Sequence, residues 1–98
     1  MTRDQILSVL RNHRGELEAR GVTHAALFGS MARNEGRADS DIDILVEIDP
    51  TAPIGVWGYS DVILFLQGLF DQAVDVAQRE ALRPHVRPGA ERDAVYAF

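Results

Sequence analysis

The chain has 98 residues, of which 46% are hydrophobic, and a formal net charge of -5. This length predicts a single domain over residues 1–98, with one hydrophobic core and little room for a separate substrate-recognition domain. The negative charge argues against non-specific nucleic-acid binding, which needs dense positive charge, so we expect no direct contact with DNA. Cysteine is absent, which excludes disulfides and thiolate metal sites.

The N-terminal segment is charged throughout and lacks the apolar core of a secretion signal. No run approaches the ~20 apolar residues that a membrane span requires. We therefore expect a soluble, cytoplasmic protein that does not contact a membrane.

The first part of the chain has a helical pattern. Thr2 and Gln5 resemble a capping box, and apolar residues recur at helical spacing until Gly21, a residue type that often ends helices. The pattern predicts a helix over about residues 2–20. The next stretch, Thr23–Phe28, is short and apolar and ends at a Gly-Ser pair, which predicts a strand that runs into a turn.

A short helix and a second strand are expected after this turn. Ser30 is placed to cap a helix over residues 31–33, and the polar residues 34–40 are typical of a turn. Acidic and apolar residues then alternate at the start of residues 41–48. This alternation predicts a strand with two different faces.

The second half of the chain predicts three more elements. Residues 51–59 contain one proline and two glycines and are expected to form a loop, which an apolar helix over about residues 60–69 follows. A short strand is predicted over residues 74–77. The last helix is predicted over residues 89–98.

Two carboxylates open the second predicted strand. Asp41 and Asp43 point to the same face and lie roughly 6 to 7 Å apart at Cα, close enough to ligate one or two divalent metals. Oxygen ligands suit Mg²⁺ or Mn²⁺, and the absence of nearby His or Cys counts against zinc. Asp75, which projects away from Val74 and Val76, is the best candidate for a third carboxylate. Its position beside the other two depends on the strand order.

The Gly-Ser pair is a candidate phosphate site. Gly29 lets the backbone approach a phosphate closely, and Ser30 opens a helix whose first N–H groups favour an anion. Metal and phosphate sites on neighbouring strand ends are the arrangement that phosphoryl transfer requires. Each feature alone is an ordinary turn or strand start, but their combination in this order favours a catalytic site.

The segment GSMARNEGRADSDID, Gly29–Asp43, resembles the GSxARG…SDxD signature of nucleotidyltransferases of the DNA polymerase β superfamily. The remainder is similar to the minimal nucleotidyltransferase (MNT) antitoxins that are paired with HEPN-domain toxins. This resemblance covers nearly the whole chain and implies a DNA polymerase β-like α+β (two-layer α/β) fold, a small mixed sheet flanked by helices. Asn34 stands where the family usually has Gly. Because Asn tolerates left-handed backbone, we expect the turn to be kept.

The resemblance also implies a role for each candidate residue. Asp41 and Asp43 would bind the metal that carries a nucleoside triphosphate. Gly29 and Ser30 would hold its phosphates. Asp75 would complete the metal site and activate the acceptor hydroxyl.

Other side chains allow two interpretations. Arg33 contacts a phosphate or an acidic partner, or it braces the turn, and the two interpretations carry equal weight. Trp57 and Tyr59 are of the residue types enriched in interface hot spots, but we expect them to pack in the core or a loop. Glu47 lies on the acidic face but is expected to be too far from the metal.

By this resemblance, the chain is a nucleotidyltransferase antitoxin that transfers AMP from Mg²⁺-ATP to a hydroxyl, expected to be a tyrosine, of a cognate HEPN toxin and thereby neutralises it. Pyrophosphate is the second product. Two alternatives stay open: an antitoxin that masks its toxin by binding without catalysis, and a small-molecule nucleotidyltransferase of the aminoglycoside type. Homo- and hetero-oligomers are both compatible with the sequence.

Overall fold

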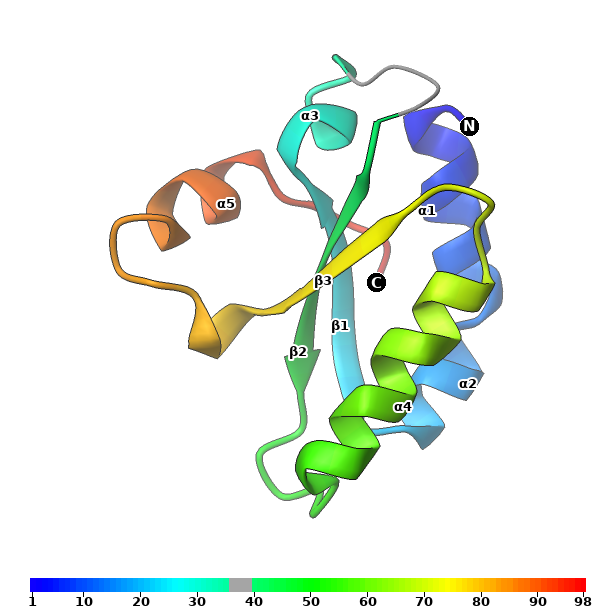
Figure 1. The fold of residues 1–98 in the computed structure, drawn as a ribbon, viewed down its shortest axis with the longest axis vertical. Coiled ribbons are helices and arrows are strands. Elements are labelled where there is room, and N and C mark those ends of the chain that lie inside the picture. The colour runs from blue at the N-terminus through cyan, green and yellow to red at the C-terminus, as the bar shows by residue number, and fades with distance from the viewer. Residues whose placement is uncertain (36–39) are drawn as a thin grey trace.

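The computed structural model describes residues 1–35 and 40–98 and centres on a four-stranded mixed sheet with strand order β3-β2-β1-β4 (Figure 1). β1 runs antiparallel to both β2 and β4, whereas β2 and β3 are parallel. The strands are β1 (Val22–Phe28), β2 (Ile42–Ile48), β3 (Val74–Gln78) and β4 (Val95–Tyr96). The predicted α+β fold with a small mixed sheet is confirmed.

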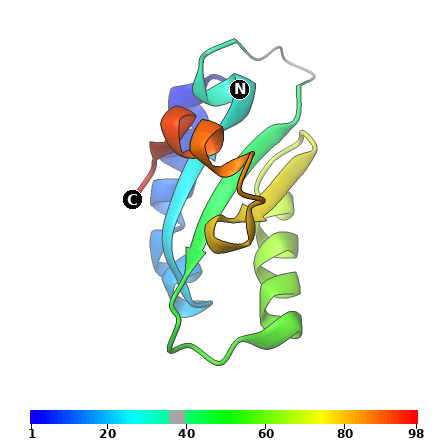
Figure 2. The same cartoon turned by 90° about the vertical axis from the view of Figure 1, so that its left-hand side faces the viewer.

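Helices cover both faces of this sheet. Figure 1 shows α5 on the left of the strands and α1, α2 and α4 on the right, and Figure 2 shows α5 in front of the strands with the N-terminal helices behind them. The helices are α1 (Arg3–Asn12), α2 (Arg14–Ala19), α3 (Gly29–Ala32), α4 (Gly55–Gly68), the 3-10 turn η1 (Arg79–Ala81) and α5 (Arg87–Asp93).

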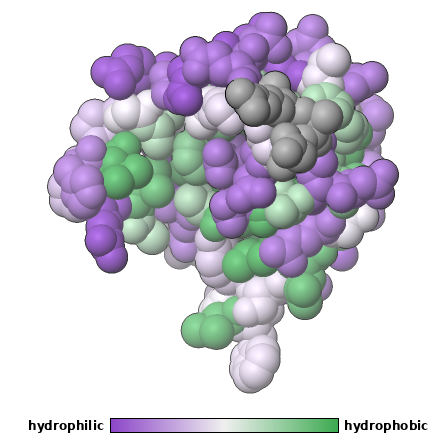
Figure 3. All heavy atoms as spheres, turned by 45° about the horizontal axis from the view of Figure 1, so that its top comes forward, coloured by the Kyte–Doolittle hydropathy of each residue, from purple (hydrophilic) through white to green (hydrophobic). Residues whose placement is uncertain are grey.

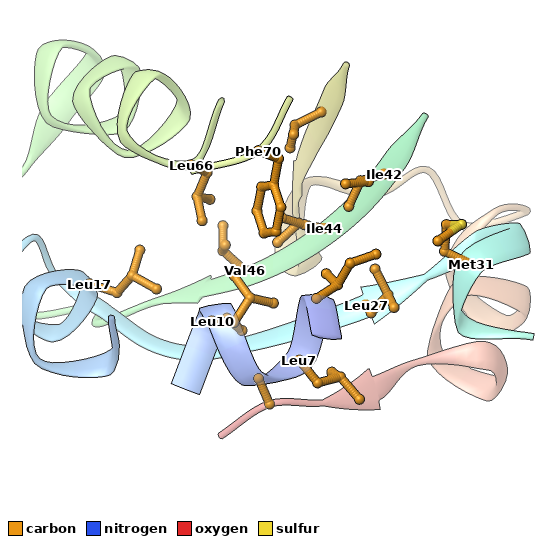
Figure 4. Close-up of a cluster of buried hydrophobic side chains, with 14 of the residues drawn as sticks. Leu7, Leu10, Leu17, Leu27, Met31, Ile42, Ile44, Val46, Leu66 and Phe70 are labelled. Atoms are coloured by element: carbon orange, nitrogen blue, oxygen red, sulfur yellow. The ribbon is translucent and has the colours of Figure 1, made fainter. Parts of the chain in front are cut away.

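The core lies between the sheet and the helices α1, α2 and α4. Figure 4 shows Ile42, Ile44 and Val46 of β2 pointing toward the same cluster as Leu10 of α1 and Leu66 of α4. All five side chains are fully buried. Burying such a side chain contributes roughly 1.5–3 kcal/mol. The alternation of β2 therefore fixes which face is buried, and it turns the acidic residues of this strand to the opposite face.

The N-terminal helix is broken once. The predicted capping box is present, because Thr2 accepts from the Gln5 N–H and Gln5 accepts from the Thr2 N–H. The prediction of one helix over residues 2–20 is wrong, because His13 leaves helical geometry (φ -107°, ψ 16°) and separates α1 from α2. The His13 Nδ1 lies 2.8 Å from the Val9 carbonyl oxygen, so the ring pairs with the last turn of α1.

Helix α4 begins earlier than predicted, because residues 55–59 are helical and not part of a loop. Gly55, with φ +62°, starts the helix, and Gly58 lies inside it, so glycines that suggested a loop are helical. A Cβ at Gly58 would lie 2.5 Å from the Ile54 Cβ, so this glycine is needed for Ile54 to pack against the helix.

The C-terminal prediction is also corrected. Instead of one helix over residues 89–98, α5 ends at Asp93 and the chain continues as β4 along the edge of β1. Ala94 is extended (ψ 131°), and the Ala97 N–H donates to the Ala25 carbonyl at 2.8 Å. Valine and tyrosine favour strands, and here their pairing satisfies backbone groups of β1. Across the described residues, no helix has the length and apolar character needed to cross a membrane.

Candidate active site

Three carboxylates meet where β2 and β3 begin. Asp43 and Asp75 are directly opposite each other in the parallel register of β2 and β3. Neighbouring strands lie about 4.8 Å apart, so these two side chains stand side by side on the face away from the core. Asp41 is exposed and lies two residues before Asp43, just outside β2. The strand order thus places Asp75 beside the pair that the sequence pattern identified.

The electrostatics of Asp43 reflect this crowding. Burial raises the pKa of the Asp43 carboxyl above its ordinary value, and the nearby negative charges of Asp75 and Asp41 raise it further. The Arg33 guanidinium has a smaller, opposite effect on this pKa. The negative charge of the three carboxylates therefore exceeds the positive charge of the nearby Arg33 side chain. A bound divalent cation would relieve the repulsion between the carboxylates.

The donor chemistry fits a magnesium-type ion. All three side chains offer carboxylate oxygens, which are hard ligands of the kind that Mg²⁺ accepts together with water and substrate phosphates. In the described part of the chain, no three His, Cys, Asp or Glu side chains are spaced so that together they could hold a metal ion. The carboxylates are thus electrostatically coupled but do not form a closed cage, and substrate oxygens would have to complete the coordination.

Gly29 lies against Asp43. It connects β1 to α3 with φ +73°, a left-handed conformation that glycine adopts without strain. A Cβ at this position would overlap the Asp43 Oδ2 and lie 3.2 Å from its Cγ. Phe28, the preceding residue, is paired with Asp43 across the antiparallel ladder. The Gly-Ser turn is therefore beside the carboxylates, as the motif predicts.

The cap of α3 differs from the prediction. The helix spans Gly29–Ala32 and not residues 31–33, its N-cap is Phe28, and no side chain forms a capping hydrogen bond. Ser30 therefore lies inside the helix and does not cap it. Its carbonyl accepts the Glu35 N–H at 2.8 Å. Asn34 has φ +61°, so the left-handed turn expected from this residue is present. Part of the predicted turn, residues 36–39, lies outside the described residues.

Arg33 braces the turn. Its Nη1 donates to the Asp93 Oδ2 at 2.7 Å, and its Nε donates to the Glu35 Oε2 at 3.3 Å. These hydrogen bonds raise the pKa of Arg33. These contacts fit the bracing interpretation, and the phosphate contact stays a prediction. Asp93, the residue of α5 that holds this guanidinium beside Asp43, was missed, because a single acid near a helix end carries no distinctive pattern.

A second positioning residue was also missed. The Gln72 Nε2 donates to the Ser40 carbonyl at 2.8 Å, and the Ile42 N–H donates to the Ala73 carbonyl at 2.9 Å. The loop before β3 therefore holds the chain as it enters β2. This fixes the backbone on both sides of Asp41.

At the other end of this sheet face, near the C-terminal end of β2, Glu47 forms hydrogen bonds of its own. Glu47 accepts hydrogen bonds from the Arg79 Nη1 at 3.3 Å and from the Tyr96 hydroxyl at 2.9 Å, so it is engaged away from the candidate metal ligands, as expected. A pocket of about 540 Å³ lies near Ile48 and Gln78, at the far ends of β2 and β3, and none of the three candidate aspartates lines it.

Known proteins share this sequence pattern. The profile of a nucleotidyltransferase domain matches residues 10–97. Protein adenylyltransferase MntA of Thermococcus cleftensis is 31% identical over 97 residues, which cover 98% of this chain and 96% of the relative. A Methanocaldococcus jannaschii protein with the provisional name protein adenylyltransferase is 36% identical over 97 residues, which cover 97% of each chain.

Solved structures share the fold. A structure described provisionally as a minimal nucleotidyltransferase is 27% identical, with a TM-score of 0.78, and the match covers 97% of this chain and 95% of that chain. A toxin-antitoxin crystal structure with AMP-PNP has a TM-score of 0.65 at 20% identity, and the match covers 100% of this chain and 73% of that chain. A complex of tri-AMPylated Shewanella oneidensis HEPN toxin with MNT antitoxin has a TM-score of 0.63 at 16% identity, and the match covers 94% of this chain and 71% of that chain.

The last two matches show the fold alone. The domain profile and the relatives above 30% identity each cover most of this chain. The chain belongs to the nucleotidyltransferase domain family, among the minimal nucleotidyltransferases.

Proposed function

We propose that this nucleotidyltransferase transfers AMP from Mg²⁺-ATP to a tyrosine hydroxyl of a HEPN-domain toxin and so acts as its antitoxin. The observation that carries the proposal is the pairing of Asp43 with Asp75 beside the Gly29 turn. The name of the relative MntA gives the reaction class, protein adenylyl transfer. The AMPylated toxin in one structural neighbour supports the identity of the acceptor.

The reaction is a substitution at the α-phosphorus of ATP. The acceptor hydroxyl oxygen forms a new P–O bond, the bond to the bridging oxygen between the α- and β-phosphates breaks, and pyrophosphate leaves with the electron pair. Asp75 lies at the edge of the carboxylate cluster and is exposed, so it is the group that takes the hydroxyl proton. The protein otherwise acts by positioning and charge neutralisation.

Asp41 and Asp43 would hold Mg²⁺, which when bound neutralises the phosphates and the crowded carboxylates. Gly29 and Ser30 would offer backbone N–H groups to the phosphates at the turn, and the absence of a Cβ on Gly29 lets the Asp43 carboxylate pack directly against this turn. Arg33 contributes positive charge near Asp43 while Asp93 fixes its position. All of these groups lie within residues 1–98, which we propose act as a single domain.

A labelling experiment tests this function. The purified chain, ATP labelled at the α-phosphate, Mg²⁺ and a HEPN-domain toxin are incubated together, and label covalently attached to protein is measured. The wild type is expected to label the partner only when Mg²⁺ is present, and Asp41→Asn/Asp43→Asn is expected to lose the activity. Label at the γ-phosphate should not be transferred, because that phosphate leaves in pyrophosphate.

Glu18→Gln is the matched control, since it removes an exposed carboxylate of α2, outside the carboxylate cluster and the pocket, and should leave labelling intact. Absence of label, together with equal neutralisation of the partner by wild type and double variant, would overturn the enzymatic account and leave an antitoxin that masks its toxin. Transfer to an aminoglycoside in place of the protein would identify the small-molecule alternative.

A further inference from the structure

Helix α4 exposes large apolar side chains that the rest of the protein does not cover. Val56 is 79% exposed, Trp57 is 87% exposed and Leu64 is 67% exposed. The prediction that Trp57 packs in the core or a loop is therefore wrong. The opposite side of α4 packs on the sheet through Val62 and Leu66, both fully buried. Because the buried side already stabilises the helix, the outward apolar side chains contribute little to the fold.

These side chains form one face of the helix. Trp57, Asp61 and Leu64 follow the i, i+4, i+7 spacing that aligns residues along one side. Asp61, between the two apolar residues, forms an ion pair with Arg20 at 3.1 Å, and the Arg20 guanidinium lies over the Phe65 ring at 4.1 Å from its centroid. The negative charge of Asp61, in the middle of this face, is thus neutralised by Arg20 of the same chain.

The apolar face protrudes at the N-terminal end of α4. Figure 3 shows pale and green side chains projecting at the lower edge, the end at which α4 begins in Figure 1. Scattered apolar residues on a surface are ordinary, but Trp57 lies in line with Leu64, and Val56, next to Trp57 in the sequence, is also largely exposed. An exposed tryptophan of this kind is typical of a protein-binding surface.

The pocket of about 540 Å³ adjoins this end of the helix. Ile54, Gly55 and Tyr59 of the first turns of α4 line one side of it, and Asp49 and Glu80 also line it. Among the residues that the structure describes, these two acids are its only charged lining residues. Glu80 forms no ion pair with any residue that the structure describes. The pocket therefore combines an apolar wall with negative charge.

We propose that this surface, formed by the α4 face and the adjoining pocket, docks a basic amphipathic segment of the acceptor protein. Apolar side chains of that segment would cover Trp57 and Leu64, and an arginine or lysine would enter the pocket near Asp49 and Glu80. A second copy of this chain is a poorer occupant, because each copy carries a net charge of -5. The inference rests on the proposed function, since it assigns the acceptor a place to bind.

The docking surface is separate from the chemistry. The pocket touches Ile48 and Gln78, at the C-terminal ends of β2 and β3, whereas Asp43 and Asp75 lie near the N-terminal ends. Ile48 lies five positions after Asp43 in β2, a span of roughly 16 Å. The acceptor would thus be held at one end of the protein while its hydroxyl reaches the other. Variants of this surface should raise the acceptor KM without lowering kcat.

Trp57 reports on this surface directly, because it is the only tryptophan in the chain. The full chain is titrated with a HEPN-domain toxin in the absence of nucleotide. The Kd is measured by calorimetry, and the Trp57 fluorescence emission is recorded with a tryptophan-free form of the toxin. The Trp57 emission is expected to shift to shorter wavelength on binding. Trp57→Ser, Leu64→Ser and Glu80→Arg are each expected to weaken binding, with Trp57→Ser weakening it at least about tenfold.

Two matched variants serve as controls. Val86→Ser removes an exposed apolar side chain next to α5, and Asp4→Arg makes the same charge change as Glu80→Arg at the start of α1. Both should bind like the wild type. Circular dichroism and thermal unfolding of every variant confirm that the fold is kept.

Wild-type affinity in the Trp57→Ser and Glu80→Arg variants would overturn the docking proposal, even if AMP transfer to the partner is intact. A wild-type dimer that Trp57→Ser converts to a monomer would overturn it as well, because the face would then bind a second copy. Failure of the proposed function has a different result: the wild-type chain transfers no α-phosphate label to the partner, even when the partner is at saturating concentration. Docking variants that still transfer AMP at a saturating concentration of the partner, but with a raised KM for it, would support both the proposed function and the docking proposal.

Discussion

Gly29 and Asp43 are in contact across the antiparallel pairing of β1 and β2, and the space for a Cβ on Gly29 is already filled by the Asp43 carboxylate. The turn that is expected to hold phosphate and the carboxylate that is expected to hold metal are therefore packed against each other. Any side chain at Gly29 must displace Asp43 or the turn. The glycine of the motif has a steric role in addition to its left-handed conformation.

Gly29→Ala tests this relationship. The variant combines an unfavourable φ of +73° with overlap of Asp43, so we expect a loss of about 1–3 kcal/mol in the free energy of unfolding. Adenylyl transfer should fall at least about tenfold, because displacement of a positioned group by 1 Å is enough to cost up to 100-fold. Urea unfolding and α-phosphate labelling measure the two effects.

Gly15→Ala is the matched control. Gly15 lies in α2, and no atom lies within 4 Å of a Cβ at this position. Alanine favours helices over glycine, so this variant should gain roughly 0.5–1 kcal/mol and keep full transfer activity. A Gly29→Ala protein with the stability and activity of the Gly15→Ala protein would contradict the steric role.

The pair of Arg33 and Asp93 gives a second prediction. Asp93→Asn weakens the contact that ties α5 to the turn after α3, so the Arg33 guanidinium gains freedom beside Asp43. We expect the KM for ATP to rise while kcat changes little, because the guanidinium contributes charge near the phosphates and does not transfer a proton. Steady-state kinetics measure both parameters.

Asp93→Glu should restore much of the lost ATP affinity, since it keeps the carboxylate. Arg92→Ala, at the neighbouring position of α5, should leave both kinetic parameters unchanged. A lower kcat at constant KM in Asp93→Asn would show that Asp93 serves the chemical step and not nucleotide binding.

Part of this architecture follows from local sequence patterns. The alternation in residues 41–48 predicts both the strand and the side on which Asp41 and Asp43 lie, because the side-chain period of a strand is two. The capping box at Thr2 and the left-handed turn at Asn34 follow from single side chains whose preferences are strong. Each of these features is decided within a few residues.

Other features depend on contacts between distant segments. The pairing of Asp43 with Asp75 requires β3 to lie parallel to β2, which no local pattern specifies. Gly58 is compatible with a helix only because Ile54 packs against it, and β4 forms because β1 offers a free edge. Asp93, one of the two acidic partners of Arg33, is 60 residues away in the sequence. These relationships are tertiary, so periodicity and propensity did not predict them.

A pH-dependent contact lies at the other end of β2. The Thr51 hydroxyl donates to the Asp49 Oδ1 at 2.7 Å and the Thr51 N–H donates to the same oxygen at 2.8 Å, and these bonds lower the pKa of Asp49. A folded pKa below the unfolded one means that this stabilisation is complete above the unfolded pKa and is lost as the pH falls through the folded pKa.

Thr51→Val should therefore move the pKa of Asp49 upward, but not fully to its ordinary value, because the backbone N–H remains. Carboxyl chemical shifts followed by NMR across the acidic range measure this pKa. Thr23→Val is the control, since the Thr23 hydroxyl donates to the Glu47 carbonyl and does not contact Asp49. An unchanged pKa in Thr51→Val would show that the hydroxyl is not the main cause of the shift.

Asp75 should show a trade-off between stability and activity. Its charge repels Asp43 across the β2–β3 pairing, so Asp75→Asn is expected to raise Tm by a few degrees at most. The same change removes the proposed base and should lower kcat by roughly 100- to 10,000-fold.

Mg²⁺ should raise the Tm of the wild type, because a ligand that binds only the folded state stabilises it, and should raise the Tm of Asp75→Asn less. Asp71→Asn, four residues earlier and outside the carboxylate cluster, should respond to Mg²⁺ like the wild type. Equal Mg²⁺ responses in the wild type and Asp75→Asn would remove Asp75 from the metal site, and a retained kcat would remove it from the chemistry.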